Sequence, residues 1–229
     1  MFTVFRPTAS ILFKSSSSLL KKAVIPTSGK PRIAPLVRSM PLMTINQSLR
    51  GTLKEHQIIP DVVDDFTPTA LLSVEYPKGK TVSLGNTLDP DATQEQPFIR
   101  IAPDGDGAAT YTAVLTDPDA PSRDDPKWSE FCHWIITGLK AESAMEVSVD
   151  VSKAKQIVKY MGPAPPEKTG KHRYVFLLYK DGKTGEMEGP KERKKWGNEE
   201  QRHGVSQWAA KYDLKLVGAN FFFAQNKEQ

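Results

Sequence analysis

The feature that most constrains the fold is a succession of short apolar runs, rich in β-branched and aromatic residues, separated by turn-forming sequences. The runs occupy residues 70–76, 81–85, 98–101, 111–116, 131–137, 173–179, 214–217 and 220–224. Proline- and glycine-containing stretches such as LDPDATQEQP and PDGDG divide them. Many short strands without long helices between them are typical of an antiparallel β-sandwich or barrel. We therefore predict an all-β-dominated domain.

A few short helices are expected at the periphery of this domain. Thr44 begins a capping-box pattern, and apolar residues then repeat on one helical face as far as Leu53. Asn198 begins the same cap pattern before an apolar stripe within residues 205–212. These patterns predict one helix near residue 44 and one after residue 198.

Residues 1–43 differ in composition from the rest of the chain. They are basic and rich in serine and proline, and they contain only short apolar clusters. This composition is typical of a mitochondrial presequence, or transit peptide, and it also fits a disordered extension that a later start would bypass. We expect a mitochondrial protein if the segment is a working presequence and a cytoplasmic one otherwise. Residues 44–229 are predicted to form one domain.

Charge and cysteine content exclude several protein classes. The first 50 residues carry eight basic and no acidic groups, although the whole chain has a formal charge of only +4, so the remainder is net acidic. We therefore expect no nucleic-acid partner. No apolar run is long enough to span a membrane. The single cysteine, Cys132, excludes an internal disulfide framework and suits a reducing compartment.

Two loops place a histidine beside a predicted strand. In TDPDAPSRDDPKWSEFCHW, residues 116–134, prolines end one strand and His133 lies in the next. In GPAPPEKTGKHRY, residues 162–174, a proline-rich loop leads to His172 at the start of another strand. We expect Asp124, Asp125 and Glu130 to be solvated turn residues rather than metal ligands. Because Cys132 and His133 are adjacent in a strand, their side chains should face opposite sides, and we expect an inert thiol.

The two motifs in this order resemble the signatures of the phosphatidylethanolamine-binding proteins, a family that includes the Raf kinase inhibitor protein and plant flowering regulators. The resemblance covers residues 44–226 and includes the stretches TLDPDA and LVGANFFFA. The elements WSEFCH, YMGPAPP and HRYVFLLY are similar to those of the fungal branch of the family, which contains carboxypeptidase inhibitors.

The resemblance implies a β-sandwich with one small pocket for phosphate or a phospholipid head group. The implied ligand-binding residues are Asp117, Ala120, Pro121, Trp128, Phe131, His133, Gly162, Ala164, Pro165, His172 and Tyr174, with Phe222 where the family often has a tyrosine that closes the pocket. It also implies cis peptide bonds between Ala120 and Pro121 and between Ser129 and Glu130. No catalytic residue, metal ligand or cofactor is implied.

In such a pocket, we expect His133 and His172 to hold an anion by charge-assisted hydrogen bonds. Two imidazoles near their ordinary pKa would make anion binding strengthen on acidification. Asp117 could orient an imidazole by accepting its second N–H, or it could bind an ammonium group such as that of ethanolamine. Ala164 stands where the family commonly has glycine, which implies a tighter loop.

Three functional classes are considered. The first is a regulatory binding protein that inhibits a serine carboxypeptidase, in which the resemblance implies that the chain's N-terminal segment makes the inhibitory contact. The second is a phospholipid- or phosphoanion-binding modulator of kinase or Ras signalling without protease inhibition. The third is a hydrolase using Asp117 and the two histidines. We rank the hydrolase last and expect no enzyme, because the sequence contains no evident activated nucleophile or metal-ligand spacing.

Overall fold

The computed structural model describes residues 42–105, 108–141, 146–149, 151–182, 185–198 and 201–229. The predicted presequence or extension, residues 1–43, falls almost wholly outside the described residues. Its assignment, its cleavage and the domain boundary at residue 44 therefore stay predictions.

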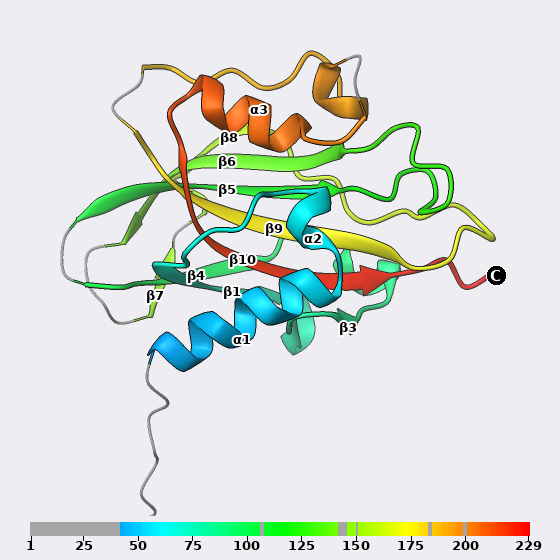
Figure 1. The fold of residues 1–229 in the computed structure, drawn as a ribbon, viewed down its shortest axis with the longest axis horizontal. Coiled ribbons are helices and arrows are strands. Elements are labelled where there is room, and N and C mark those ends of the chain that lie inside the picture. Colours follow the sequence, from blue (N-terminus) through cyan, green and yellow to red (C-terminus); the bar gives the residue numbers. More distant parts are fainter. Residues whose placement is uncertain (1–41, 106–107, 142–145, 150, 183–184, 199–200) are drawn as a thin grey trace, which may run out of the picture. The chain divides into compact units, whose positions relative to one another are not determined.

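The described residues form two stacked β-sheets, which confirms the predicted β-sandwich (Figure 1). One sheet has the order β2-β1-β4-β7 and the other has the order β3-β10-β9-β5-β6-β8. Strand pairs are antiparallel except for the parallel pair of β3 with β10. The strands are β1 (Ala70–Tyr76), β2 (Lys80–Thr81), β3 (Asn86–Thr87), β4 (Phe98–Pro103), β5 (Ala109–Asp117), β6 (Phe131–Ala141), β7 (Val147–Val149), β8 (Lys155–Val158), β9 (His172–Lys180) and β10 (Lys215–Ala224).

Apolar side chains from both sheets fill the space between them. In β1 buried and half-buried residues alternate strictly, so that Leu72, Val74 and Tyr76 face the second sheet. In β9 every residue from His172 to Tyr179 is buried. This difference follows from the layers, because β1 has one covered face and β9 has two. Phe176 and Leu178 of β9 belong to the same core as the β1 residues.

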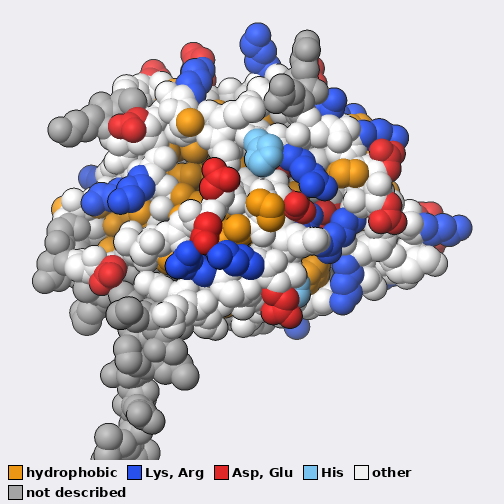
Figure 2. Space-filling model, in the orientation of Figure 1, with side chains coloured by type: hydrophobic (Ala, Val, Ile, Leu, Met, Phe, Trp, Pro, Cys, Tyr) orange, Lys and Arg blue, Asp and Glu red, His pale blue; other side chains and the backbone are white. Residues whose placement is uncertain are grey.

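Three α-helices cover the outer face of the six-stranded sheet (Figure 1). They are α1 (Leu42–Glu55), α2 (Ile58–Asp61) and α3 (Gly204–Lys211), and the short 3₁₀ turns are η1 (Pro77–Gly79), η2 (Pro90–Thr93) and η3 (Lys194–Gly197). Leu53, Ile58 and Val205 pack against sheet residues such as Leu177. Basic and acidic side chains are intermingled on this face (Figure 2). None of the described helices combines the length and apolarity needed to cross a membrane.

The predicted strands differ from the structure in three respects. Residues 82–85 are not a strand, because Leu84 and Gly85 take positive φ values of 39° and 101° and turn the chain between β2 and β3. The two predicted runs near the C-terminus are one strand, β10, with an irregularity between Leu216 and Gly218. Strands β3, β7 and β8 were not predicted, since each is short and lies at a sheet edge.

Both predicted helices are present, but neither begins at its predicted cap. Helix α1 begins at Leu42, so Thr44 lies inside it. Helix α3 begins at Gly204, six residues after the predicted cap Asn198. The Asn198 side chain instead donates from Nδ2 to Oε1 of Gln207, at 2.9 Å. A capping-box spacing marks a favourable start, but tertiary contacts decide which start is used.

Candidate functional site

A cavity of about 100 Å³ lies where β5 ends and β6 and β9 begin. Its lining contains ten of the twelve residues that the sequence suggested for a ligand site, and Met161 and Pro166 in addition. The ten are Asp117, Ala120, Pro121, Trp128, Phe131, His133, Gly162, Ala164, His172 and Tyr174. Pro165 and Phe222 are buried but do not line the cavity. Binding of a ligand by these residues stays a prediction.

Phe222 lies behind Tyr174, which lines the cavity. Their rings are stacked with centroids 5.4 Å apart, so Phe222 holds Tyr174 from behind. Burial raises the pKa of the Tyr174 hydroxyl well above its ordinary value, and Tyr174 is therefore neutral near neutral pH. At another wall, the Lys194 ammonium lies 4.1 Å from the centroid of the Trp128 ring, a cation–π contact.

The turn after β5 carries both implied cis bonds. The peptide bonds between Ala120 and Pro121 and between Ser129 and Glu130 are cis, as expected, and a third cis bond precedes Pro60. The backbone N–H of Trp128 donates to the carbonyl of Ala120 at 2.9 Å. This bond brings two walls of the cavity together, although eight positions separate them in the chain.

Asp117 and His172 form a buried pair at the cavity. His172 Nδ1 is 2.9 Å from Asp117 Oδ2, and His172 Nε2 is 3.0 Å from Thr169 Oγ1. Thr169 Oγ1 also donates to the carbonyl of Pro166 at 2.7 Å, which uses its single proton. An imidazolium at His172 therefore satisfies all these contacts. Asp117 Oδ1 accepts from the backbone N–H of Asp119 at 2.7 Å, so the geometry supports the imidazole-orienting role of Asp117 rather than ammonium binding.

His133 is the second imidazole of the cavity, and its environment differs from that of His172. Its Nδ1–H donates to the carbonyl of Met161 at 2.8 Å. Its Nε2 is neither hydrogen-bonded to a described residue nor sealed from solvent, so this nitrogen is available to a ligand. Burial lowers the pKa of His133 below its ordinary value, although the charge of Asp117 opposes the shift. The expectation of an unperturbed pKa therefore does not hold for His133.

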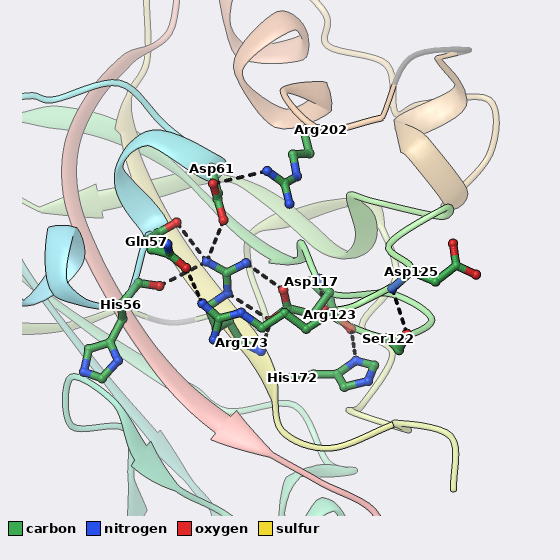
Figure 3. Close-up of polar contacts among 11 residues, drawn as sticks. His56, Gln57, Asp61, Asp117, Ser122, Arg123, Asp125, His172, Arg173 and Arg202 are labelled. Carbon is green, nitrogen blue, oxygen red and sulfur yellow. Dashed lines mark hydrogen bonds and ion pairs between the residues drawn. The ribbon is translucent and has the colours of Figure 1, made fainter. Parts of the chain in front are cut away.

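A second buried pair, which the sequence did not suggest, joins the same turn to the same strand. Asp119 Oδ2 accepts from Arg173 Nε at 2.9 Å, and Asp119 Oδ1 accepts from Arg173 Nη2 at 2.6 Å, a bidentate contact. Arg173 Nη1 donates to the carbonyls of His56 and Gln57 and to Asp61 (Figure 3). The sequence signal that could have suggested this pair is the Asp-Pro-Asp of the first motif together with the His-Arg of the second. It pairs both aspartates with consecutive residues of β9.

The loop between β8 and β9, residues 159–171, has no regular secondary structure and is called the pocket loop below. Gln94 Nε2 donates to the carbonyl of Pro163 at 2.8 Å. Gly162 packs so closely on Gln94 that a Cβ at this position would lie 2.9 Å from the Gln94 Cα. Asn226 Nδ2 donates to the carbonyl of Pro165 at 3.1 Å. The loop has no backbone ladder, and contacts from distant segments fix its position instead.

Glu130 is fully buried, which corrects the expectation of a solvated turn residue. Its Oε2 accepts from Thr116 Oγ1 at 3.0 Å, whereas its Oε1 and the Ser129 hydroxyl have no partner among the described residues. Burial raises the pKa of Glu130 to about 8, although the backbone at the start of α3 favours the ionised form. Cys132 is buried as expected, and burial raises the pKa of its thiol. Asp124 and Asp125 are exposed.

The chemistry available at the cavity follows from its polar groups. Cys132 faces away from the cavity lining and carries a protonated thiol, so it is not an activated nucleophile. Within the described ranges, no three His, Cys, Asp or Glu residues are grouped so as to hold a metal ion. The accessible polar atom of His133 can accept a hydrogen bond when the ring is neutral and donate one when it is protonated.

Comparisons with known proteins give a consistent result. A family model described as "Phosphatidylethanolamine-binding protein" matches residues 73–222. The carboxypeptidase Y inhibitor of Saccharomyces cerevisiae is 37% identical over 213 residues, covering 79% of this chain and 96% of that protein.

Two solved structures extend this result to the fold. The crystal structure of carboxypeptidase Y inhibitor complexed with the cognate proteinase matches with a TM-score of 0.74 and 36% identity, over 81% of this chain and 100% of that chain. The phosphatidylethanolamine-binding protein from Plasmodium vivax matches with a TM-score of 0.62 and 27% identity, over 77% of this chain and 97% of that chain.

Proposed function

The chain belongs to the phosphatidylethanolamine-binding protein family, and from this membership we propose that it is a regulatory binding protein that inhibits a serine carboxypeptidase. The observation that carries the proposal is the similarity to the carboxypeptidase Y inhibitor along nearly the whole of that protein. The similarity extends to the fold of that inhibitor in its complex with the cognate proteinase. Because one fold supports many functions, the proposal needs a direct test.

The test combines the identity of the N-terminus with inhibition. The protein is purified from its native host, its first residue is determined by mass spectrometry, and the sample is titrated against carboxypeptidase Y with a peptide substrate. We expect a start between Met40 and Thr44 and tight inhibition. The His133→Ala variant is the control, and it should inhibit equally, because the resemblance assigns the contact to the N-terminal segment. Absence of inhibition by both the full-length and the trimmed protein would refute the proposal.

We further propose that the cavity binds a small anion, such as phosphate or the phosphate of a lipid head group. The support is the lining, which combines apolar walls with the accessible Nε2 of His133 beside the Asp117–His172 pair. His133 can donate to an anion only when Nε2 is protonated, and burial lowers its pKa. Affinity should therefore rise as the pH falls through the pKa of His133, below about 6.5.

Titration with inorganic phosphate, followed through the imidazole NMR signals, measures this binding directly. Loss of affinity in His133→Ala or His172→Ala is expected, and vesicles containing phosphatidylethanolamine separate lipid from free phosphate as the source of the anion. Ring signals of the wild-type protein that do not respond to millimolar phosphate at pH 5.5 would rule out the anion site. A role in kinase or Ras signalling stays a prediction from the resemblance alone.

A further inference from the structure

We propose that Arg193 is the positioning residue of the anion site, because its guanidinium fixes His133 against the pocket loop and supplies the positive charge that the cavity lining lacks. This inference rests on the proposed anion binding. Arg193 does not line the cavity and therefore acts through its neighbours.

The contacts of Arg193 join the start of β6 to the start of the pocket loop. Its Nη1 donates to the carbonyls of Cys132 and His133, both at 2.9 Å, and its Nη2 donates to the carbonyl of Lys159 at 2.8 Å. The Arg193 carbonyl in turn accepts from the backbone N–H of Cys132 at 2.8 Å. One side chain thus sets the separation of two segments that both contribute to the cavity.

The position of His133 depends on this separation. The carbonyl of His133 accepts from the backbone N–H of Met161 at 3.0 Å, and the His133 ring donates to the carbonyl of Met161 at 2.8 Å. Both bonds cross from β6 to the pocket loop, at the place where Arg193 also bridges them. If the loop moves relative to β6, the ring loses the partner that fixes its tautomer and its orientation.

The cavity lining itself provides no net positive charge near neutral pH. The carboxylate of Asp117 offsets an imidazolium at His172, since the two form a buried pair. His133 is neutral because burial lowers its pKa, and Tyr174 is neutral because burial raises its pKa. An anion therefore meets a lining whose own charges cancel, and desolvation would disfavour its entry.

Arg193 supplies a permanent cation beside this lining. Its hydrogen-bond partners are neutral carbonyl groups, and no carboxylate in the described part of the chain forms an ion pair with it. Burial is the main cause of the lowered pKa of His133; among the nearby charges, Asp117 raises this pKa, and Arg193 and His172 lower it. An anion bound at the protonated Nε2 would experience the same field with the opposite, favourable sign.

The test uses the full chain with Arg193→Met and Arg193→Lys, inorganic phosphate as the probe, and the pH titration of the His133 ring as a second readout. At a pH low enough to protonate His133 in both proteins, we expect phosphate affinity in Arg193→Met to fall on the order of tenfold. The pKa of His133 should rise, because a nearby cation has been removed. In Arg193→Lys the pKa of His133 should stay near the wild-type value, while affinity falls by a smaller factor, because a compact ammonium lacks the planar fork whose two ends reach β6 and the pocket loop.

Lys159→Met is the matched control. It removes an exposed cation from the same part of the pocket loop and leaves the carbonyl that Arg193 contacts. Affinity within about twofold of the wild type is expected for this control, since exposed charges are screened.

The outcomes separate the two proposals. A wild-type protein that does not bind phosphate refutes the anion site, whereas the rise of the His133 pKa in Arg193→Met would still support the placement of the charge. Wild-type binding together with unchanged affinity and unchanged His133 pKa in Arg193→Met overturns the role of Arg193. If Arg193→Met does not fold, wild-type affinity in Arg193→Lys would overturn the positioning role.

Discussion

Replacement of Arg173 with methionine should cause a large loss of stability, because it isolates a buried carboxylate. The side chains of Arg173 and Asp119 are each about 1% exposed, and the pair is bidentate. Asp119 Oδ2 keeps only the backbone N–H of residue 173 after the substitution. The carbonyls of His56 and Gln57 lose the same guanidinium.

The magnitude follows from this burial. Removal of one partner from a buried ion pair costs about 3–5 kcal/mol, a large part of the ~5–15 kcal/mol by which a typical domain is stable. Arg100→Met is the matched control. Arg100 also forms a close pair, at 2.9 Å from Glu75, but its side chain is 41% exposed. That substitution should cost less than about 1 kcal/mol.

Urea unfolding followed by tryptophan fluorescence measures both changes, since Trp134 and Trp196 are buried. The double variant Asp119→Asn with Arg173→Met should cost less than the sum of the two single substitutions, because it removes both charges. If Arg173→Met does not fold, Asp119→Asn alone carries the comparison with Arg100→Met. A free energy of unfolding for the buried variants within 1 kcal/mol of the control would refute the reasoning.

Two further predictions concern Glu130, which is fully buried, and Gly162, which lines the cavity. Because burial raises the pKa of Glu130 to about 8, above the unfolded value, wild-type stability should fall as the pH rises towards 8. Glu130→Gln should remove about 2–3 kcal/mol of the difference between pH 6 and pH 9 in urea unfolding, and equal pH dependence in both proteins would contradict this. Gly162→Ala should lower the free energy of unfolding by about 1–3 kcal/mol and weaken phosphate binding, because the new Cβ would lie 2.7 Å from Gln94 Oε1. A Gly162→Ala variant with wild-type stability and affinity would contradict the close packing.

The sequence predicted the elements whose patterns are local. Strand β1 alternates buried and half-buried residues, strand β9 has a continuous apolar run with aromatic residues, and the apolar stripe of α3 repeats with the helical period. The family signatures then suggested which residues share a cavity, although Met161 and Pro166 were missed. Pro165 is buried away from the cavity whereas Pro166 lines it, and the order of residues does not determine this in an irregular loop.

The properties that were not predicted depend on contacts between distant residues. Glu130 follows a cis bond in a polar stretch and looks solvated in the sequence, but α3 and η3 cover it. Arg193 belongs to a run of basic residues that is typical of a solvated surface, and only the fold brings its guanidinium to three carbonyls. The pKa of His133 likewise depends on burial, which no short motif encodes.

The pairing of one turn with two consecutive residues of β9 has an evolutionary consequence. Asp117 binds His172, next to the cavity, while Asp119 binds Arg173, next to α2. Since neighbouring strand residues face opposite sides, a shift of one residue in either segment would leave both aspartates opposite the wrong partners. Insertions and deletions should therefore be excluded from these two short segments, and the two segments should be inherited together. The length of the chain between the segments is free to change.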